Sequence, residues 1–376
     1  MPFCAGKCDY CDFYSVPVNQ PELRYEGSLL ERFVKTLLFE GRRLFETYKP
    51  GKIPSLYIGG GTPSVLGPAG IRHLLEGLLQ LITGFSSPPV EITVELNPES
   101  VDEVFLAEIS EAGVTRLSLG IQSFYGPSRQ AVSRIGDEAH LDKSLSLAAQ
   151  YFPAAFSVDL ISGLPLQNEN ILLDDINAVT GYKPSHISLY ALTMKENTLL
   201  ANLPDGDEAD RLWILGRDAL EKSGYSQYEV SNFCQGGRES LHNVRYWRLQ
   251  NWLALGPAAS ATIINDETGT GLRYTYPPDV NEWLSPLLSP LRPPLTEELD
   301  TITLVKETLL MGFRYTGGPD EDLFLRRFHR CITDCIPETL KAWRGRGLLQ
   351  KDKPALTKEG LLLLNRFLIE AFEELE

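Results

Sequence analysis

The chain has 376 residues, 43% of them hydrophobic and 23% charged, and this length predicts two or three globular domains. No apolar run approaches the roughly 18 residues that a membrane helix needs, so we expect a soluble protein without a membrane span. A formal net charge of −15 would repel phosphate backbones over most of the surface, which argues against nucleic acid as a partner.

Three cysteines, Cys4, Cys8 and Cys11, open the chain in a C-x3-C-x2-C spacing. Thiolates are soft ligands for zinc and for iron–sulfur clusters, and both usually take four ligands. Three thiolates in one short loop can hold three irons of a cubane and leave the fourth iron open to an external ligand. The spacing alone leaves open a zinc knuckle completed by a distant residue, or unligated thiols. Cysteines this close would make poor structural disulfides, so we expect a reducing cytoplasm.

Short apolar runs alternate with stretches of helical period over the first half of the chain. Helical spacing of apolar residues is clearest at 24–48, 101–113 and 137–152. The strand-like runs are SLYIGGGTPS (55–64), VEITVELNPES (90–100), TRLSLGIQSF (115–124), FSVDLISGLP (156–165) and HISLYALT (186–193). This alternation predicts an α/β fold with a closed or partly closed parallel sheet, whose functional residues lie at the C-terminal ends of its strands.

The organisation changes near Pro204. Residues 228–261 are dense in aromatic, glycine and polar residues, and residues 276–298 are rich enough in proline for a linker or an irregular connection. The remaining tail is mostly helical in period, with turns at 315–322 and 350–360. We therefore expect a core barrel at residues 1–203, a barrel extension with a linker at 204–296, and a small helical domain at 297–376.

The run PFCAGKCDYCDF, residues 2–13, resembles the cluster loop of radical S-adenosylmethionine (radical SAM) enzymes. With the strand-end motifs and YEVSNF at 228–233, it is similar to the branch that holds the oxygen-independent coproporphyrinogen III oxidases and the HemW heme chaperones. The resemblance covers nearly the whole chain in order. It implies a partial (βα)6 TIM-like radical SAM barrel, with its first strand largely missing here, and a mainly helical, winged-helix-like C-terminal domain.

The resemblance also implies the cofactors. A [4Fe–4S] cluster would sit on Cys4, Cys8 and Cys11, and S-adenosylmethionine (SAM) would chelate the open iron. Reduction of the cluster by an electron donor such as flavodoxin or ferredoxin would then yield a 5′-deoxyadenosyl radical, while the protein positions SAM and excludes water.

Strand-end residues are expected to contact SAM. The backbone N–H groups of Gly60, Gly61 and Thr62 would be free to receive its amino-acid part, although a simple strand-to-helix turn also explains this loop, which lacks the lysine of a P-loop. By resemblance the further SAM contacts are Glu95, Gln122, Arg134 and Asp159. An arginine suits the carboxylate of SAM, and an aspartate suits its ribose hydroxyls. Each of these residues could instead be an ordinary capping or salt-bridge residue.

Two functions remain open after the cofactors are assigned. The oxidases carry a fourth cysteine two residues after the third, where this chain has Phe13, and a long N-terminal segment that helps to bind porphyrinogen. The phenylalanine is similar to the HemW type, which binds heme and hands it to acceptor proteins. We therefore expect a heme chaperone with an unidentified acceptor protein, and the coproporphyrinogen oxidase is the alternative.

The stretch HNVRYW, His242 to Trp247, matches a motif of the HemW type. A neutral imidazole is a good axial ligand for heme iron, and Tyr246 and Trp247 could pack against a macrocycle. A lone histidine beside aromatic residues is also common as hydrogen-bonded structure. For His186 we expect packing or a hydrogen bond inside the sheet.

Cys331 and Cys335 lie four residues apart near His329 and could form a small metal site, although buried free thiols are the commoner outcome, also for Cys234. A winged-helix-like tail could suggest DNA binding, but the acidic balance argues against it.

Three departures from the family pattern stand out. Members carry a full first barrel strand before the cluster loop, and its absence here suggests a shortened start or a fragment. Lys195 stands where a glutamate is expected, with Glu196 next to it. Ser260 replaces a histidine in a glycine-rich motif.

Overall fold

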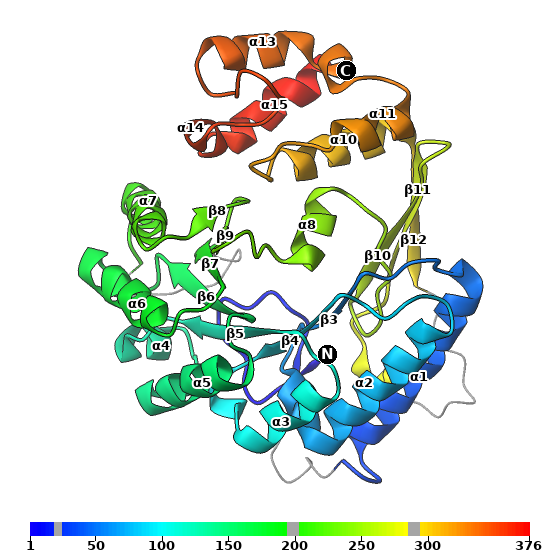
Figure 1. Ribbon diagram of the computed structural model, residues 1–376, viewed down its shortest axis with the longest axis vertical. Helices are drawn as coiled ribbons and strands as arrows, with labels where there is room; N and C mark the ends of the chain where they lie inside the picture. Colours follow the sequence, from blue (N-terminus) through cyan, green and yellow to red (C-terminus); the bar gives the residue numbers. More distant parts are fainter. Residues whose placement is uncertain (19–24, 194–202, 285–293) are drawn as a thin grey trace.

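The computed structural model describes residues 1–18, 25–193, 203–284 and 294–376 (Figure 1). Its centre is a seven-stranded sheet in the order β3-β4-β5-β6-β7-β9-β8. The parallel strands are β3 (Ser55–Ile58), β4 (Glu91–Leu96), β5 (Arg116–Gln122), β6 (Phe156–Ser162) and β7 (His186–Ala191), and the antiparallel ones are β9 (Asn232–Cys234) and β8 (Ser226–Gln227). All five strands predicted from the sequence are confirmed.

Helices follow the parallel strands and lie along the outer side of the sheet (Figure 1). They are α1 (Leu29–Tyr48), α2 (Gly67–Thr83), α3 (Glu103–Glu111), α4 (Gly126–Ala131), α5 (Glu138–Tyr151), α6 (Glu169–Gly181) and α7 (Gly206–Lys222), with 3-10 turns at Pro63–Leu66 and Pro98–Ser100. Most begin at a side chain that accepts from a free backbone N–H of the first turn: Ser28, Asp102, Asp137, Asn168 and Asp205. These caps explain where the helical periods start.

The two faces of the sheet differ in chemistry because side chains alternate along each strand. The face toward the helices is apolar and buried, as at Val94, Leu119 and Val158. The inner face is polar. Taken strand by strand from β3 to β7, it carries Ser55, Tyr57, Glu91, Thr93, Glu95, Arg116, Ser118, Ser157, Asp159, His186 and Ser188. The sheet therefore surrounds a polar interior with an apolar outer shell.

The start of the chain contributes a short strand. β1 (Phe3–Cys4) pairs in parallel with β2 (Val16–Pro17) in a separate two-stranded sheet. Among the described residues β3 is thus the edge of the main sheet. The α/β fold with a reduced first strand is confirmed.

A second sheet lies beside the first. It is antiparallel and consists of β10 (Ser260–Asn265), β11 (Thr270–Thr275) and β12 (Leu295–Leu299), with α9 (Val280–Trp283) after β11. Residues 276–298 were predicted to be a linker or an irregular connection. That prediction is wrong for the last residues of this range, which belong to strand β12. The domain boundaries stay a prediction, although β12 spans the one expected at 296/297.

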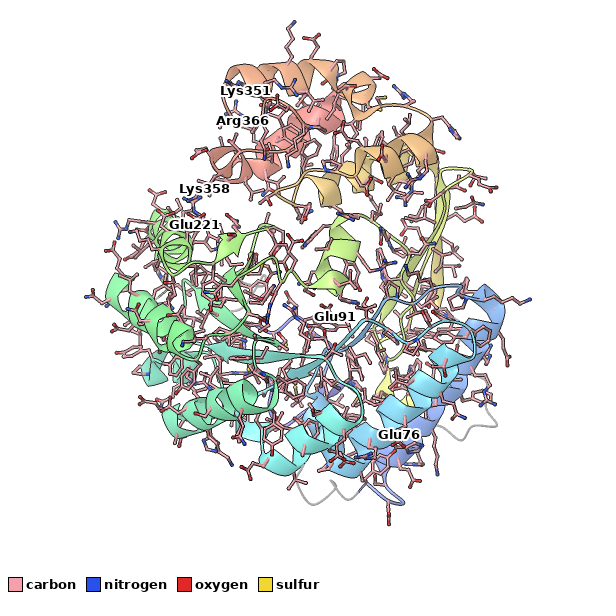
Figure 2. All side chains as sticks on the ribbon, in the orientation of Figure 1. Glu76, Glu91, Glu221, Lys351, Lys358 and Arg366 are labelled. Carbon is pink, nitrogen blue, oxygen red and sulfur yellow. The ribbon has the colours of Figure 1, made fainter. Side chains whose placement is uncertain are left out.

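The C-terminal part is helical, as expected. Its helices are α10 (Thr301–Gly312), α11 (Glu321–Phe328), α12 (Ile332–Cys335), α13 (Pro337–Gly345), α14 (Lys358–Leu361) and α15 (Leu364–Glu374), and a bridge pairs Leu349 with Leu356. Trp343 and Phe313 pack on Phe367 in a separate core. Lys358 forms ion pairs with Asp218 and Glu221 of α7 and so ties this part to the barrel (Figure 2).

α8 (Leu241–Trp247) lies between the main sheet and α10 (Figure 1). Within the described ranges, no helix has the length and apolar character needed to cross a membrane.

Candidate functional site

The cluster loop places the three N-terminal cysteines against the strand ends. Cys4 Sγ lies 3.1 Å from Thr62 Oγ1, and the backbone N–H of Cys11 donates to the carbonyl of Cys8 at 3.1 Å. None of the three cysteines is in a disulfide bond among the described residues. Burial raises the pKa of the Cys4 thiol, the hydrogen bond with Thr62 lowers it, and the neighbouring Cys11 and Cys8 raise it further. The sulfurs of Cys8 and Cys11 therefore lie within electrostatic range of Cys4.

The glycine loop after β3 does not offer the free donors that we expected. Gly60 N donates to Glu95 Oε2 at 2.9 Å, Gly61 N to the Met1 carbonyl at 2.7 Å, and Thr62 N to the Phe3 carbonyl at 2.6 Å. The expectation of free N–H groups is wrong because residues 1–3 run beside the loop and accept from it as a strand would. Gly61 must be glycine, since a Cβ there would collide with the Phe3 carbonyl.

Arg134, one of the predicted SAM contacts, connects the cluster loop with the ends of β4 and β5. Its Nη1 lies 3.7 Å from Cys8 Sγ, and its Nη2 donates to Asn97 Oδ1 at 2.8 Å and to the Gly120 carbonyl. A Cβ added at Gly120 would lie 3.1 Å from Gln122 Nε2 and 3.0 Å from Arg134 Nη2, so both side chains converge over this glycine. The structure thus brings Gln122 and Arg134 together.

Asn97 is a site residue that the sequence reasoning missed. Its amide donates to Thr62 Oγ1 at 2.8 Å, while its oxygen accepts from Arg134. It connects the loop after β3 with the arginine beside Cys8. Its position directly after β4, two residues beyond Glu95, could have marked it as a candidate, because strand ends carry the functional residues of such folds.

Two acidic residues complete this end of the barrel. Burial raises the pKa of Asp159 to about 6, although Ser188 and Ser118 donate to its carboxylate, the latter at 3.2 Å. Burial also raises the pKa of Glu95, and hydrogen bonds from Tyr57 and Gly60 oppose this effect. Repulsion from Glu95 further raises the pKa of Asp159, so the two carboxyls lie near each other.

Polar atoms without partners remain at the site. Gln122 Oε1 and Arg134 Nε are buried and have no hydrogen-bond partner within the described part of the chain. Gln122 also adopts a positive φ of 70°, which is strained for a residue other than glycine. Unpaired buried polar groups are costly, and a ligand with amino, carboxylate and hydroxyl groups would satisfy them.

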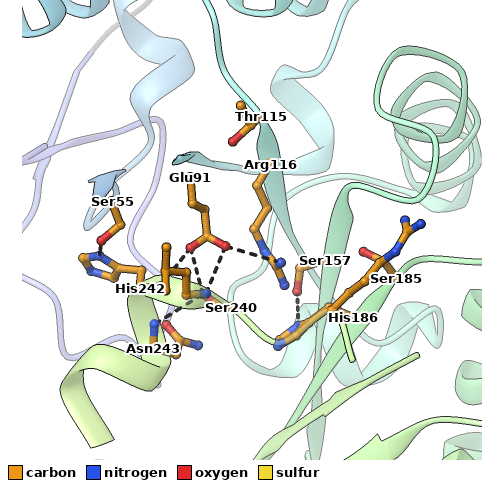
Figure 3. A network of polar contacts seen from close by, with 12 residues as sticks. Ser55, Glu91, Thr115, Arg116, Ser157, Ser185, His186, Ser240, His242 and Asn243 are labelled. Atoms are coloured by element: carbon orange, nitrogen blue, oxygen red, sulfur yellow. Dashed lines mark hydrogen bonds and ion pairs between the residues drawn. The ribbon is translucent and has the colours of Figure 1, made fainter. Parts of the chain in front are cut away.

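His242 lies on α8, at the opposite ends of the strands (Figure 3). Its Nδ1 lies 3.1 Å from Ser55 Oγ, and its ring stacks on Tyr57 with centroids 4.6 Å apart. Burial and the neighbouring Arg245 lower the pKa of His242 to about 4, so the imidazole is neutral at pH 7. The structure records no partner for its Nε2 among the residues it describes.

The comparisons with known proteins fit this geometry. Residues 1–179 match the model of the radical SAM superfamily. The chain is 35% identical over 269 residues to the heme chaperone HemW of Haemophilus influenzae, covering 70% of this chain and 69% of that protein. The chain belongs to the HemW-type family of the radical SAM superfamily. The mouse mitochondrial radical S-adenosyl methionine domain-containing protein 1 is 32% identical over 377 residues, covering 97% of this chain and 80% of that protein.

A solved structure supports the fold of this HemW-type chain. The coproporphyrinogen III oxidase HemN from Escherichia coli superposes with a TM-score of 0.80, at 19% identity, over 99% of this chain and 88% of that one. At that identity the likeness shows the radical SAM fold alone.

As a radical SAM protein, this HemW-type chain uses a [4Fe–4S] cluster and SAM, and its residues fit the cluster. In the described segments, no group of three or more His, Cys, Asp or Glu side chains surrounds a single metal position. Cubane ligands bind separate irons, so their sulfurs need not converge on one point. The positive charge of Arg134 near Cys8 suits an anionic cluster.

The other histidines and cysteines have structural surroundings. His186 is buried between Ser157 Oγ at 2.7 Å and the Tyr228 hydroxyl at 2.8 Å, which confirms the predicted hydrogen bonding inside the sheet. Cys335 and Cys234 are buried free thiols, while Cys331 is exposed. Two departures from the family pattern lie away from the cluster loop. Ser260, which replaces a histidine, begins β10, whereas Lys195 and Glu196 fall outside the described residues.

Proposed function

We propose that this HemW-type chain binds heme and delivers it to an acceptor protein, the role that the relatives' name, heme chaperone, describes. The observation that carries the proposal is His242, a neutral imidazole whose Nδ1 is engaged by Ser55 and whose Nε2 has no recorded partner among the described residues. A neutral imidazole nitrogen held in a fixed orientation is suited to an axial position on heme iron.

The surroundings of His242 suit a porphyrin. The Tyr246 ring stands edge-on to the imidazole with centroids 5.0 Å apart, and Trp247 Nε1 is a buried donor without a partner in the described part of the chain. Arg245 is partly buried, burial lowers its pKa, and no ion pair is recorded for it among the described residues. Heme carries propionates, and one of them would neutralise this cation. Phe13, 57% exposed, supplies no fourth thiol for oxidase chemistry.

We infer the following assignment of cofactor contacts. Cys4, Cys8 and Cys11 would hold the cluster, whose bound SAM is the source of radical chemistry. The SAM contacts would be Gly60, Gly61, Thr62, Glu95, Gln122, Arg134 and Asp159. Residues 1–3 would have to release at least part of the glycine loop if its N–H groups bind the SAM carboxylate.

The partners follow from the same proposal. A one-electron donor such as flavodoxin or ferredoxin would reduce the cluster, and a chain whose described cysteines form no disulfide suits a reducing cytoplasm. The heme acceptor is a protein whose identity is open.

An anaerobic hemin titration of the cluster-reconstituted protein, followed in the Soret band, tests the proposal. We expect saturable binding near one heme per chain, with at least a tenfold loss of affinity in His242→Ala. His73→Ala is the matched control, because His73 lies on outer helix α2 and contacts Tyr25. Absence of saturable binding in a protein with an intact cluster, or formation of protoporphyrinogen from coproporphyrinogen with SAM and reductant, would overturn the chaperone role.

A further inference from the structure

Tyr57 connects the two sites described above. Its hydroxyl donates to Glu95 Oε1 at 2.5 Å, and its ring stacks on the His242 imidazole at an interplanar angle of 20°. One side chain of β3 therefore contacts both the carboxylate at the strand ends and the histidine of α8 at the strand starts.

The contact with Glu95 continues into the glycine loop. The second carboxylate oxygen of Glu95 accepts from Gly60 N at 2.9 Å. The loop packs so tightly on this pair that a Cβ at Gly59 would lie 2.5 Å from Glu95 Oε2 and 2.7 Å from the Tyr57 ring. A displacement of Glu95 must therefore also move the glycine loop and the Tyr57 side chain, because close-packed interiors transmit strain.

The same region accommodates a nitrogen donor. The backbone nitrogen of Met1 donates to the Gly59 carbonyl at 2.8 Å. The amino group of SAM would arrive at this loop as well. Its N–H groups would compete with the Tyr57 hydroxyl as donors to the Glu95 carboxylate.

We propose that Tyr57 is a positioning residue that couples occupancy of the SAM site to the orientation of His242, so that SAM changes the affinity of the chain for heme. The inference rests on the proposed function and deepens it. Two ligands influence each other only through an element that differs between their bound states, and the influence is reciprocal. Here that element is the Tyr57 side chain: when SAM displaces its hydroxyl from Glu95, the ring moves with the hydroxyl and shifts the stacked His242 imidazole.

The decisive variant is Tyr57→Phe, which keeps the ring on His242 and removes the hydroxyl from Glu95. Tyr276→Phe is the matched control. The Tyr276 hydroxyl also donates to a buried glutamate, Glu40 Oε1 at 2.8 Å, but this pair lies between α1 and β11 and contacts neither site.

Hemin titrations with and without saturating SAM measure the coupling in the cluster-reconstituted protein. We expect the hemin Kd of the unmodified chain to change at least fivefold with SAM, and the SAM Kd to change by the same factor with hemin. In Tyr57→Phe the hemin Kd values with and without SAM should differ by less than twofold. In Tyr276→Phe they should differ as much as in the unmodified chain. A ratio of the two Kd values near one in the unmodified chain, or an unchanged ratio in Tyr57→Phe, would overturn the coupling.

A second readout works without heme. The chain has five histidines, so a protein labelled with 15N-histidine has few ring signals, and His242→Ala identifies the one of interest. SAM should shift the His242 signal in the unmodified chain and in Tyr276→Phe but not in Tyr57→Phe. If SAM gives these shifts but hemin does not bind, the chaperone role is refuted and the coupling through Tyr57 is supported. If SAM shifts the His242 signal equally in Tyr57→Phe, the coupling is refuted.

Discussion

The backbone N–H of His242 donates to a carboxylate oxygen of Glu91 at 2.9 Å, across a separation of 151 residues in the chain. Leu241 N donates to the other oxygen at 3.0 Å, and Arg116 pairs with Glu91 at 3.7 Å (Figure 3). The first residue of β4 thus caps the helix that carries the HNVRYW motif. A carboxylate at a helix N-terminus is favourable because it faces the unpaired N–H groups there.

Glu91→Gln should destabilise the protein. The substitution removes the charge that faces the α8 N-terminus and leaves the buried Arg116 without its anion, so we expect the unfolding free energy to fall by about 2–4 kcal/mol. Urea unfolding monitored by circular dichroism measures the loss. Glu76→Gln is the control, since that side chain is 61% exposed and pairs with Arg72 on the surface of α2, so its loss should be about 0–0.5 kcal/mol (Figure 2). Equal midpoints for the two variants would contradict the capping role.

The stability of the heme-free protein should depend on pH through His242. Burial lowers the folded-state pKa to about 4, below the ordinary value of 6.5, so the unfolded chain takes up the proton first as the pH falls. The unfolding free energy therefore decreases between about pH 6.5 and pH 4, and at pH 5 this one group accounts for about 1–2 kcal/mol. In His242→Gln, the unfolding free energy should fall less between pH 7 and pH 5 than in the unmodified chain, by about the 1–2 kcal/mol that this group contributes. His140→Gln, on the exposed surface of α5, should retain this contribution; a full acid decrease in His242→Gln would refute the assignment.

Cys8→Ala should abolish the cluster. Cys8 is buried in the loop beside Arg134, and a cubane held by two thiolates would be lost during gel filtration. Iron and acid-labile sulfide, determined after anaerobic reconstitution, should drop to background. Cys331→Ala, on the exposed surface of the C-terminal part, should keep full content. Unchanged iron and sulfide in Cys8→Ala would place the cluster elsewhere.

Arg134→Gln should make the cluster harder to reduce. Reduction adds negative charge near Cys8 Sγ, and the guanidinium 3.7 Å away stabilises that charge. For roughly 1 kcal/mol of lost stabilisation, the midpoint potential should fall by about 40–60 mV in a redox titration followed by electron paramagnetic resonance. Arg366→Gln, 69% exposed on α15, should leave the potential unchanged. A rise, or no change, in Arg134→Gln would show that the arginine does not act on the cluster.

The regular part of the fold was predictable because its signals are local. Strands β3 to β7 read as short apolar runs that end in polar residues, and the helices between them start at capping side chains such as Asp102 and Asn168. Strand β12 was missed because its residues Leu295–Glu298 are all exposed, so no burial pattern marks it. It is a strand because it pairs with β11, which is a distant contact.

The sequence proposed the members of the candidate site but not the contacts between them. The motif spacing singled out the cysteines, the glycine loop and His242 as candidates, yet the sequence indicated free N–H groups at Gly61 and Thr62, which in fact bond to Met1 and Phe3. Asn97 and Tyr57 lie within the runs at 90–100 and 55–64, but nothing along the chain singled them out there. Both became visible only when residues more than 30 positions apart proved to be hydrogen-bonded.

By itself, the sequence determined which chemistry this protein can carry: three thiols in one loop, polar residues at strand ends, and a histidine among aromatic residues. These depend on residue type and near-neighbour spacing, which are readable along the chain. The tertiary structure alone decided that Arg134 lies beside Cys8, that Glu91 holds α8 in place, and that Tyr57 lies between Glu95 and His242. Such contacts arise from strand order and register in a folded sheet, which place together residues that no local pattern relates.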